Sequence, residues 1–217
     1  MKDIKVNLLH STPKDVLKTA LEKPYSSEFK DSSFEKIAHK VINKMKHESV
    51  AEHINYNFEI LGISRLCLQE LVRHRIAGYT VKSTRFTLSE LKNLLIDVDL
   101  DPYDYNRNII LMSKFFCYPE NESLSEHIYN INYKFLREFN ISKNSFKNDE
   151  LKYLLPENYR TDLVMSINAR SLTNFLKLRI GDKNNKPHFE IKHLAKLMLE
   201  KALSTDTGFL FSEIKND

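Results

Sequence analysis

The sequence is short of several residue types and patterns, and each shortage excludes a class of protein. Its 217 residues include two cysteines, too few for a small secreted domain held together by disulfides. Its formal net charge of +4 is lower than dedicated nucleic-acid-binding proteins usually carry. Four glycines are present, but no glycine-rich phosphate loop. The apolar patch at residues 6–9 is interrupted by Asn7, and it is far too short for a signal peptide or a membrane span.

The chain is long enough to bury a substantial core without staples, and we expect one domain over residues 1–217. Cys67 lies in an apolar helix pattern and Cys117 in a Phe-Phe-Cys-Tyr run, so both read as small hydrophobic residues. These features predict a cytoplasmic protein without a membrane segment. The sequence contains no internal repeat and no low-complexity tract.

We expect a single α+β domain, in which an antiparallel sheet of a few strands is covered by helices. Alternating residues predict strands at 4–9 and 55–60. Helical spacing predicts helices at 13–21, 34–45, 88–95, 109–116, 128–139, 171–179 and 189–203. A capping box at residues 32–35 should begin the second helix, and residues 128, 131, 135, 136 and 139 should form the apolar side of the fifth. Residues 97–102 read as an acidic linker without a chemical role.

Residues 62–87 combine an apolar helix pattern with two basic groups, Arg73-His74-Arg75 and Ser83-Thr84-Arg85. A helix starting at Ile63 would bury one stripe and align a polar row on another face. The stripe is Ile63, Leu66, Cys67 and Leu71, and the row is Arg65, Gln69 and Arg73. Gly78 should then allow a sharp turn. Beyond it, Lys82, Ser83, Thr84 and Arg85 could grip a phosphate through cations, hydroxyls and backbone N–H groups. The alternative is that basic residues at a helix C-terminus only offset the helix dipole.

Three segments resemble one known family. Arg73-His74-Arg75 followed after seven residues by Ser83 resembles the R-H-R-x7-S signature of the flavin-dependent thymidylate synthases. Upstream, the segment from His47 to His53 is similar to the family's H-x-S-x-x-E-H segment. Downstream, the segment from Asn168 to Arg179 is similar to its N-A-R-S-L-x-N-F-x-x-L-R helix. The pieces occur in the family's order.

The resemblance implies reductive methylation of dUMP to dTMP in a homotetramer with sites between subunits. Side chains cannot supply hydride, so the family uses FAD, with NADPH and methylenetetrahydrofolate as co-substrates. It implies flavin contacts from Ser49, Glu52, Arg73, His74, Arg75, Ile76, Asn168, Arg170 and Asn174. It implies dUMP contacts from Glu70, Arg73, Val81, Lys82, Ser83, Thr84, Arg85, Lys152 and Arg179. The catalytic positions would be Arg179, Ser83 and His47, and no metal and no nucleic acid would take part.

Several positions depart from the family's pattern. Glu70 replaces a common glutamine, Val81 a common glutamate, Gly78 a usual serine, and Lys152 an arginine that binds the nucleotide phosphate. A further change covers residues 186–191, with about three extra residues before it. Lysine keeps the charge of arginine but cannot bind a phosphate in the bidentate way that arginine does. A catalytically weak or inactive relative that binds flavin or nucleotide therefore stays open, as does a basic nucleic-acid-binding protein.

Other readings of the same residues also stay open. The histidines at 47 and 53 suggest a metal site, although ligands on one helix would be spaced i and i+4. Glu52-His53 could simply cap a helical turn, and Lys152 could be solvated. Arg179 continues the apolar line of Leu172, Phe175 and Leu176, so a buried guanidinium there needs a carboxylate, a phosphate or a base edge as partner. Otherwise Arg179 extends to water from the helix end.

Overall fold

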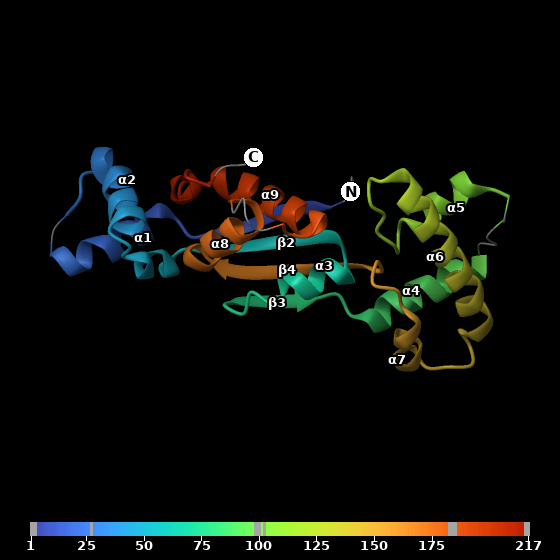
Figure 1. Cartoon of the computed structure of the whole chain (residues 1–217). Helices are drawn as coiled ribbons and strands as arrows, with labels where there is room; N and C mark the ends of the chain where they lie inside the picture. Colours follow the sequence, from blue (N-terminus) through green and yellow to red (C-terminus); the bar gives the residue numbers. More distant parts are fainter. Residues whose placement is uncertain (1–3, 27, 98–100, 102, 182–185, 215–217) are drawn as a thin grey trace. The chain divides into compact units, whose positions relative to one another are not determined.

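The structure is a computed structural model that describes residues 4–26, 28–97, 101, 103–181 and 186–214. Figure 1 draws its helices and strands along the chain. In chain order they are β1 (Lys5–Ser11), α1 (Lys14–Glu22), η1 (Lys23–Tyr25), α2 (Asp31–His39), η2 (Lys40–Lys44), η3 (Glu48–His53), β2 (Asn55–Ser64), α3 (Arg65–Leu71), β3 (Ala77–Val81), α4 (Thr84–Asp97), α5 (Tyr105–Met112), α6 (Glu122–Ser142), α7 (Asn148–Leu151), η4 (Lys152–Leu154), β4 (Arg160–Asn168), α8 (Ala169–Leu176), η5 (Lys177–Gly181), α9 (Phe189–Leu203) and η6 (Gly208–Phe211). None of the described helices is long and apolar enough to cross a bilayer.

The four strands form one sheet in the order β1-β2-β4-β3. Cross-strand contacts fix its direction, because pairs at both ends of β2 and β4 keep nearly the same sum of residue numbers. The Asn57 amide donates to Ser166 Oγ, and the Gly62 N–H donates to the Asp162 carboxylate. Such a register is antiparallel. The predicted α+β class with a small antiparallel sheet is confirmed.

The contacts of the chain divide it into two compact units. Unit 1 comprises residues 1–4, 61–69 and 81–163, and unit 2 comprises residues 5–60, 70–80 and 164–217. We describe each unit by itself. The expectation of one domain over residues 1–217 stays a prediction.

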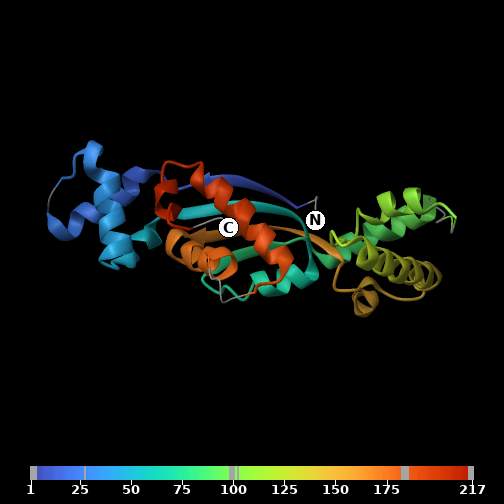
Figure 2. The ribbon, with the colours of Figure 1, turned by 45° about the horizontal axis from the view of Figure 1, so that its top comes forward.

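Unit 2 contains β1 and parts of β2, β3 and β4. Helices α8 and α9 lie on the same side of the strands (Figures 1 and 2). Tyr56, Phe58 and Ile60 alternate along β2 and are fully buried, as a half-buried strand requires. The predicted α9 stripe is also confirmed, with Ile191, Leu194, Ala195, Met198 and Ala202 all fully buried. This packing fixes the positions of α8 and α9 against the strands of unit 2.

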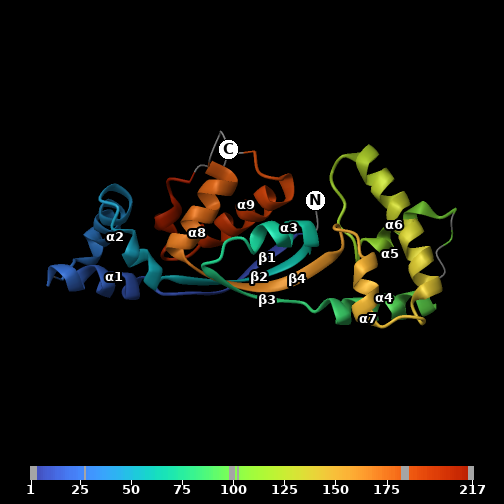
Figure 3. The same cartoon turned by 60° about the horizontal axis from the view of Figure 1, so that its bottom comes forward.

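Unit 1 contains α4, α5, α6 and α7 around a second apolar core (Figure 3). That core gathers Leu88, Leu91, Met112, Phe116, Leu136, Phe139, Leu151 and Tyr159, among others. The predicted apolar side of the helix at 128–139 is correct for Leu136 and Phe139 but wrong for Ile131, which is 62% exposed. Residues 98–100 and 102 of the expected acidic linker lie outside the described residues.

Two further expectations, both about residues 62–87, are wrong. The helix begins at Arg65 rather than Ile63, because the strand pairing continues: the N–H groups of Arg65 and Leu66 donate to Tyr159 O and Glu157 O. Leu66 is therefore turned outward and is 39% exposed. The glycine with left-handed backbone is Gly62, at φ 81°, whereas Gly78 lies inside β3. The chain turns between α3 and β3 without it.

The predicted capping box at residues 32–35 is also wrong. Helix α2 already begins at Asp31, so Ser32 and Ser33 lie within its first turn. The Ser33 hydroxyl donates back to Lys30 O instead of accepting from a helix N–H. Serine makes such local bonds readily, which weakens its value as a boundary signal.

Candidate functional site

The Arg73-His74-Arg75 segment forms a turn in unit 2, between α3 and β3. The Tyr79 hydroxyl holds this turn by donating to Leu71 O at 3.0 Å and to His74 O at 2.8 Å. Burial raises the pKa of Tyr79 to about 12, so the hydroxyl stays protonated as a donor. Arg73 and Arg75 are exposed, and neither forms an ion pair within the described part of the chain. The turn thus presents two fixed cations to their surroundings.

His74 lies between an aromatic ring and a guanidinium. Its ring meets the ring of Phe175 edge to face, with centroids 4.8 Å apart and planes at 89°. Its Nε2 lies 3.5 Å from Arg179 Nη2. Burial, and then the Arg179 charge, lower the pKa of His74 below its ordinary value. The neutral imidazole is therefore the favoured form at neutral pH.

Arg179 lies in η5, directly after α8, and pairs with Glu70. Its Nη1 lies 3.1 Å from Glu70 Oε2, and the two side chains are only 17% and 28% exposed. This confirms the expectation that a half-buried guanidinium at this position needs a polar partner. The alternative that Arg179 extends to water is wrong. Its Nε is buried without a hydrogen-bond partner among the described residues, which leaves one donor for another acceptor.

The start of α8 adds a second set of polar groups. Asn168 caps the helix, since its side-chain oxygen accepts from the Ser171 N–H at 2.8 Å. Arg170 pairs with Glu52 at 2.5 Å and approaches Glu48 at 3.5 Å. Glu52 is therefore tied to α8 rather than capping its own turn, because η3 has no side-chain cap.

These groups line one cavity of about 830 Å³ in unit 2. Five cationic side chains line it, Arg73, Arg75, Arg170, Lys177 and Arg179, against two carboxylates, Glu48 and Glu52. Apolar walls come from Ile42, Ala51, Ile76, Ala169, Leu178 and Leu210. A cavity of this size with a cationic excess suits a large anionic ligand.

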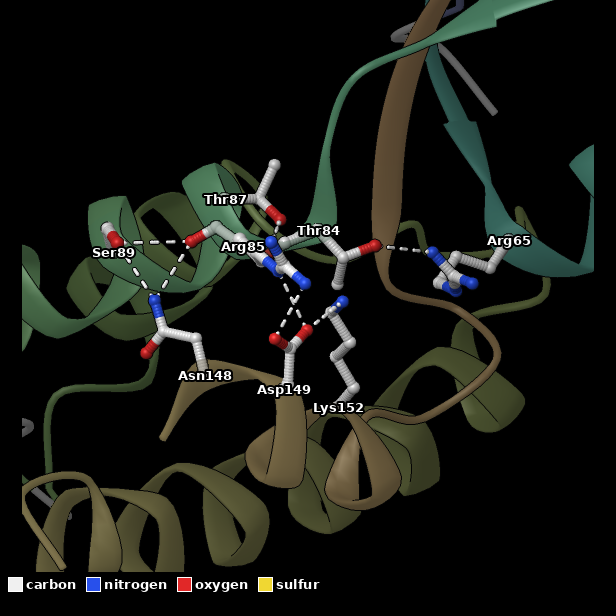
Figure 4. Close-up of polar contacts among 8 residues, drawn as sticks. All are labelled: Arg65, Thr84, Arg85, Thr87, Ser89, Asn148, Asp149 and Lys152. Carbon is white, nitrogen blue, oxygen red and sulfur yellow. Dashed lines mark hydrogen bonds and ion pairs between the residues drawn. The ribbon is translucent and has the colours of Figure 1, made fainter. Parts of the chain in front are cut away.

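A separate cationic group lies in unit 1, at the start of α4 (Figure 4). Thr84 Oγ1 accepts from Arg65 Nη1 at 3.0 Å, and Lys82 pairs with Glu90 at 3.0 Å. Arg85 binds Asp149 through two nitrogens, and Lys152 binds the same carboxylate. Ser83 is exposed, and its carbonyl accepts from the N–H groups of Phe86 and Thr87. The first turn of a helix beside two cations is a favourable place for a phosphate.

Comparisons with known proteins agree with this geometry. A family model described as "Thymidylate synthase complementing protein" matches residues 7–205. A Helicobacter pylori protein named flavin-dependent thymidylate synthase is 39% identical over 210 residues, which covers 94% of this chain and 95% of that protein. The chain belongs to the flavin-dependent thymidylate synthase family. A Campylobacter jejuni protein of the same name is 38% identical over 213 residues, covering 96% of each.

A solved structure of the flavin-dependent thymidylate synthase family has a closely similar fold. The crystal structure of Thymidylate Synthase X from Helicobacter pylori with FAD and dUMP matches with a TM-score of 0.84 and 36% identity. The match covers 97% of this chain and 98% of that one. The α+β fold with its small sheet is therefore the family's fold.

The structure brings together most of the residues that the flavin-dependent thymidylate synthase signature marks as flavin contacts. The cavity is lined by Glu52, Arg73, His74, Arg75, Ile76, Asn168, Arg170 and Asn174, together with Arg179. Ser49 and His47 are exposed and do not line it. In unit 1, Lys82, Ser83, Thr84, Arg85 and Lys152 lie around the start of α4, directly after Val81 at the end of β3.

The predicted polar row of Arg65, Gln69 and Arg73 is wrong. Arg65 binds Thr84, Gln69 binds the Glu157 carboxylate, and Arg73 lies beyond the end of α3. The helix is too short for a row of three. Sequence reasoning also missed Tyr79 and Asp149. The signals available were a tyrosine four residues after Arg75 and an aspartate three residues before Lys152.

Proposed function

We propose that this protein converts dUMP to dTMP, taking a one-carbon unit from methylenetetrahydrofolate and two electrons, by way of FAD, from NADPH. The observation that supports this most strongly is the unit 2 cavity. It gathers the matched flavin-contact residues, all except Ser49, in one concave site. These residues come from three segments, of which the first and the last are more than a hundred positions apart, and their convergence gives the motif match a physical basis.

The cavity residues fit a flavin. An electron-rich flavin ring system and a pyrophosphate are both anionic, and Arg73, Arg75 and Lys177 offer fixed positive charge. Asn174 offers an amide at the cavity wall, and the buried Nε of Arg179 is a donor that still lacks an acceptor. When bound, the flavin would supply hydride chemistry that no side chain can provide.

The chain's own residues would bind and orient the flavin and the nucleotide, and they would stabilise charge on the uracil ring. Arg179, held by Glu70, would stabilise negative charge that develops on the uracil ring as its imide N–H ionises. Neutral His74 and the Tyr79 hydroxyl would keep Arg73 and Arg75 directed at the flavin. His47 would lie on the face where nicotinamide or folate approaches.

The nucleotide phosphate would bind at the start of α4. Ser83 and Thr84 offer hydroxyls, Arg85 and Lys152 offer charge, and Lys82 lies directly before them. Both Arg85 and Lys152 are at least one third exposed, so a phosphate can reach them. Glu70 and Val81 complete the set assigned to dUMP.

The assembly and location are also part of this proposal. We propose a homotetramer in which several copies contribute to each site. We also propose a cytoplasmic location, in line with two cysteines that form no disulfide. A basic nucleic-acid-binding role and a catalytically inactive relative are less well supported, because the basic residues converge on a cavity rather than covering a surface.

The decisive experiment follows the flavin and then the reaction. The purified protein should be yellow or become yellow with added FAD, and NADPH should bleach it under nitrogen when dUMP is present. Tritium should then be released from C5-labelled dUMP only when methylenetetrahydrofolate is added. A yellow protein that releases no tritium would make it an inactive relative, and a colourless one that ignores FAD would refute the proposal.

A further inference from the structure

The start of α4 already holds an anion of its own. Arg85 donates from Nε to Asp149 Oδ1 at 2.8 Å, and its Nη2 lies 2.8 Å from Oδ2 (Figure 4). Lys152 Nζ lies 2.5 Å from Oδ1 of the same carboxylate. Two cations thus share one carboxylate, and both of its oxygens are in use.

Asp149 uses the edge of Arg85 that a phosphate would use. A guanidinium binds a carboxylate or a phosphate best through two parallel N–H donors on one edge, and such an edge accepts one partner at a time. The two cations lower the pKa of Asp149 to about 2, so the carboxylate is ionised at every pH at which the protein would work. An incoming phosphate therefore meets an occupied edge and a like charge.

Contacts other than those of Asp149 also hold Arg85 and Lys152 in place. The Asn148 amide donates to Arg85 O at 3.0 Å and to Ser89 Oγ at 2.9 Å, which ties α7 to α4 (Figure 4). The Glu150 carboxylate accepts from the Lys147 N–H at 2.8 Å and caps the same short helix. Removing the Asp149 charge should therefore leave Arg85 and Lys152 near their present places.

Stability does not explain the contact either. The side chains of Arg85, Asp149 and Lys152 are 66%, 51% and 36% exposed. Ion pairs as exposed as these contribute little to folding, because water competes for every donor. A carboxylate that engages both phosphate-binding cations and adds little to stability is better explained by its effect on binding.

We propose that Asp149 is an internal competitor for the phosphate site, which weakens the binding of the nucleotide monophosphate by occupying Arg85 and Lys152. This inference rests on the proposed function, since it takes the start of α4 as the phosphate site. The competition acts equally on substrate and product, because both carry the same 5′-phosphate. Asp149 thereby favours release of dTMP after turnover.

The test is the affinity of the FAD-bound protein for dUMP, measured by calorimetry at one fixed salt concentration. Asp149→Asn should bind dUMP and dTMP about 3- to 10-fold more tightly, because the like charge and the occupied edge are both removed. Deoxyuridine, which lacks the phosphate, should bind the variant and the wild type equally. Inorganic phosphate should compete with dUMP more strongly in the variant.

Matched variants distinguish competition by Asp149 from a general effect of charge. Asp149→Glu keeps the charge and should keep the wild-type affinity. Glu150→Gln removes the neighbouring charge but can still accept from the Lys147 N–H, so its dUMP affinity should not change. If Asp149→Asn fails to fold, Asp149→Ser supplies the same measurement.

Two results would overturn the proposal. One is an unchanged or weaker affinity of Asp149→Asn and Asp149→Ser for dUMP, which would mean that Asp149 does not compete with the phosphate. The other is an equal gain for deoxyuridine or for Glu150→Gln, which would make the effect one of overall charge. A wild-type protein that binds FAD but no dUMP would instead refute the proposed function, before any variant is compared.

Discussion

Glu70 and Arg179 form a partly buried ion pair, and Arg179 also lines the cavity. Glu70→Gln keeps the shape of the side chain and removes its charge, leaving a guanidinium that is only 17% exposed without its counter-charge. The pair lies between an exposed and a buried ion pair, so we expect a loss of about 1 kcal/mol in the free energy of unfolding. Urea denaturation of the purified variant measures it.

The matched control for this loss is Glu157→Gln, since Glu157 is exposed and binds the neutral amide of Gln69. Glu157→Gln should lower the free energy of unfolding by less than about 0.5 kcal/mol. Equal costs for the two variants would mean that the half-burial of Glu70 and Arg179 contributes nothing.

His74 makes the stability of the folded protein depend on pH, and the direction of this dependence is defined. Its pKa is lowered in the folded protein by burial and by Arg179, so the unfolded chain binds more protons below the ordinary value of about 6.5. Stability therefore rises with pH up to about 6.5, and it falls as the pH is lowered through the folded pKa. Unfolding midpoints at pH 5.5 and 7.5 should differ less in His74→Gln than in the wild type.

At the scale of elements, the turn between α3 and β3 depends on one hydroxyl. Tyr79→Phe removes the one O–H donor that Leu71 O and His74 O share, and both carbonyls must then find water. We expect a loss of about 1–2 kcal/mol in unfolding free energy. FAD should bind several-fold more weakly, because Arg73 and Arg75 lie on this turn. Thermal melts and flavin titration measure the two effects.

Tyr153→Phe is the control for the Tyr79 variant, because Tyr153 is 93% exposed. It should change neither the melting temperature nor the affinity for flavin. If Tyr79→Phe behaved like this control, the turn would be held by its neighbours rather than by the hydroxyl.

The elements themselves were largely predictable because periodicity reports burial directly. Helix α9 matches its predicted bounds of 189–203, and its apolar stripe is buried throughout. Boundaries around residues 62–66 were not predictable, since β2 continues only because β4, a hundred residues later, pairs with it. Local sequence cannot report a partner so far away.

The candidate site was predictable in its residue types but not in its pairings. The need for a partner at Arg179 followed from its place on an apolar line, yet nothing local marked Glu70 as that partner. Asp149 was missed for a related reason, because its role depends on Arg85, which lies 64 positions earlier in the chain. Motif spacing identifies which residues take part, and only the fold shows which of them touch.

At the scale of the whole molecule, the proposed reaction needs both cationic groups, the one in unit 2 and the one at the start of α4 in unit 1. A tetramer would elute with about four times the chain mass of 25.5 kDa, which light scattering measures directly. An assembly of this kind gives each reaction centre access to side chains from more than one copy. The number of copies that serve one centre can then be tested by mixing variants.

Arg75→Ala and Arg85→Ala should each abolish most tritium release, because one weakens flavin binding and the other phosphate binding. If the two arginines of one centre come from different copies, equal co-expression of the variants should restore about a quarter of the wild-type activity, since a quarter of the centres receive both intact residues. Two copies of the same variant, tagged differently and purified in the same way, are the control and should stay inactive. Mixed tetramers without activity would place both arginines of each centre in a single copy.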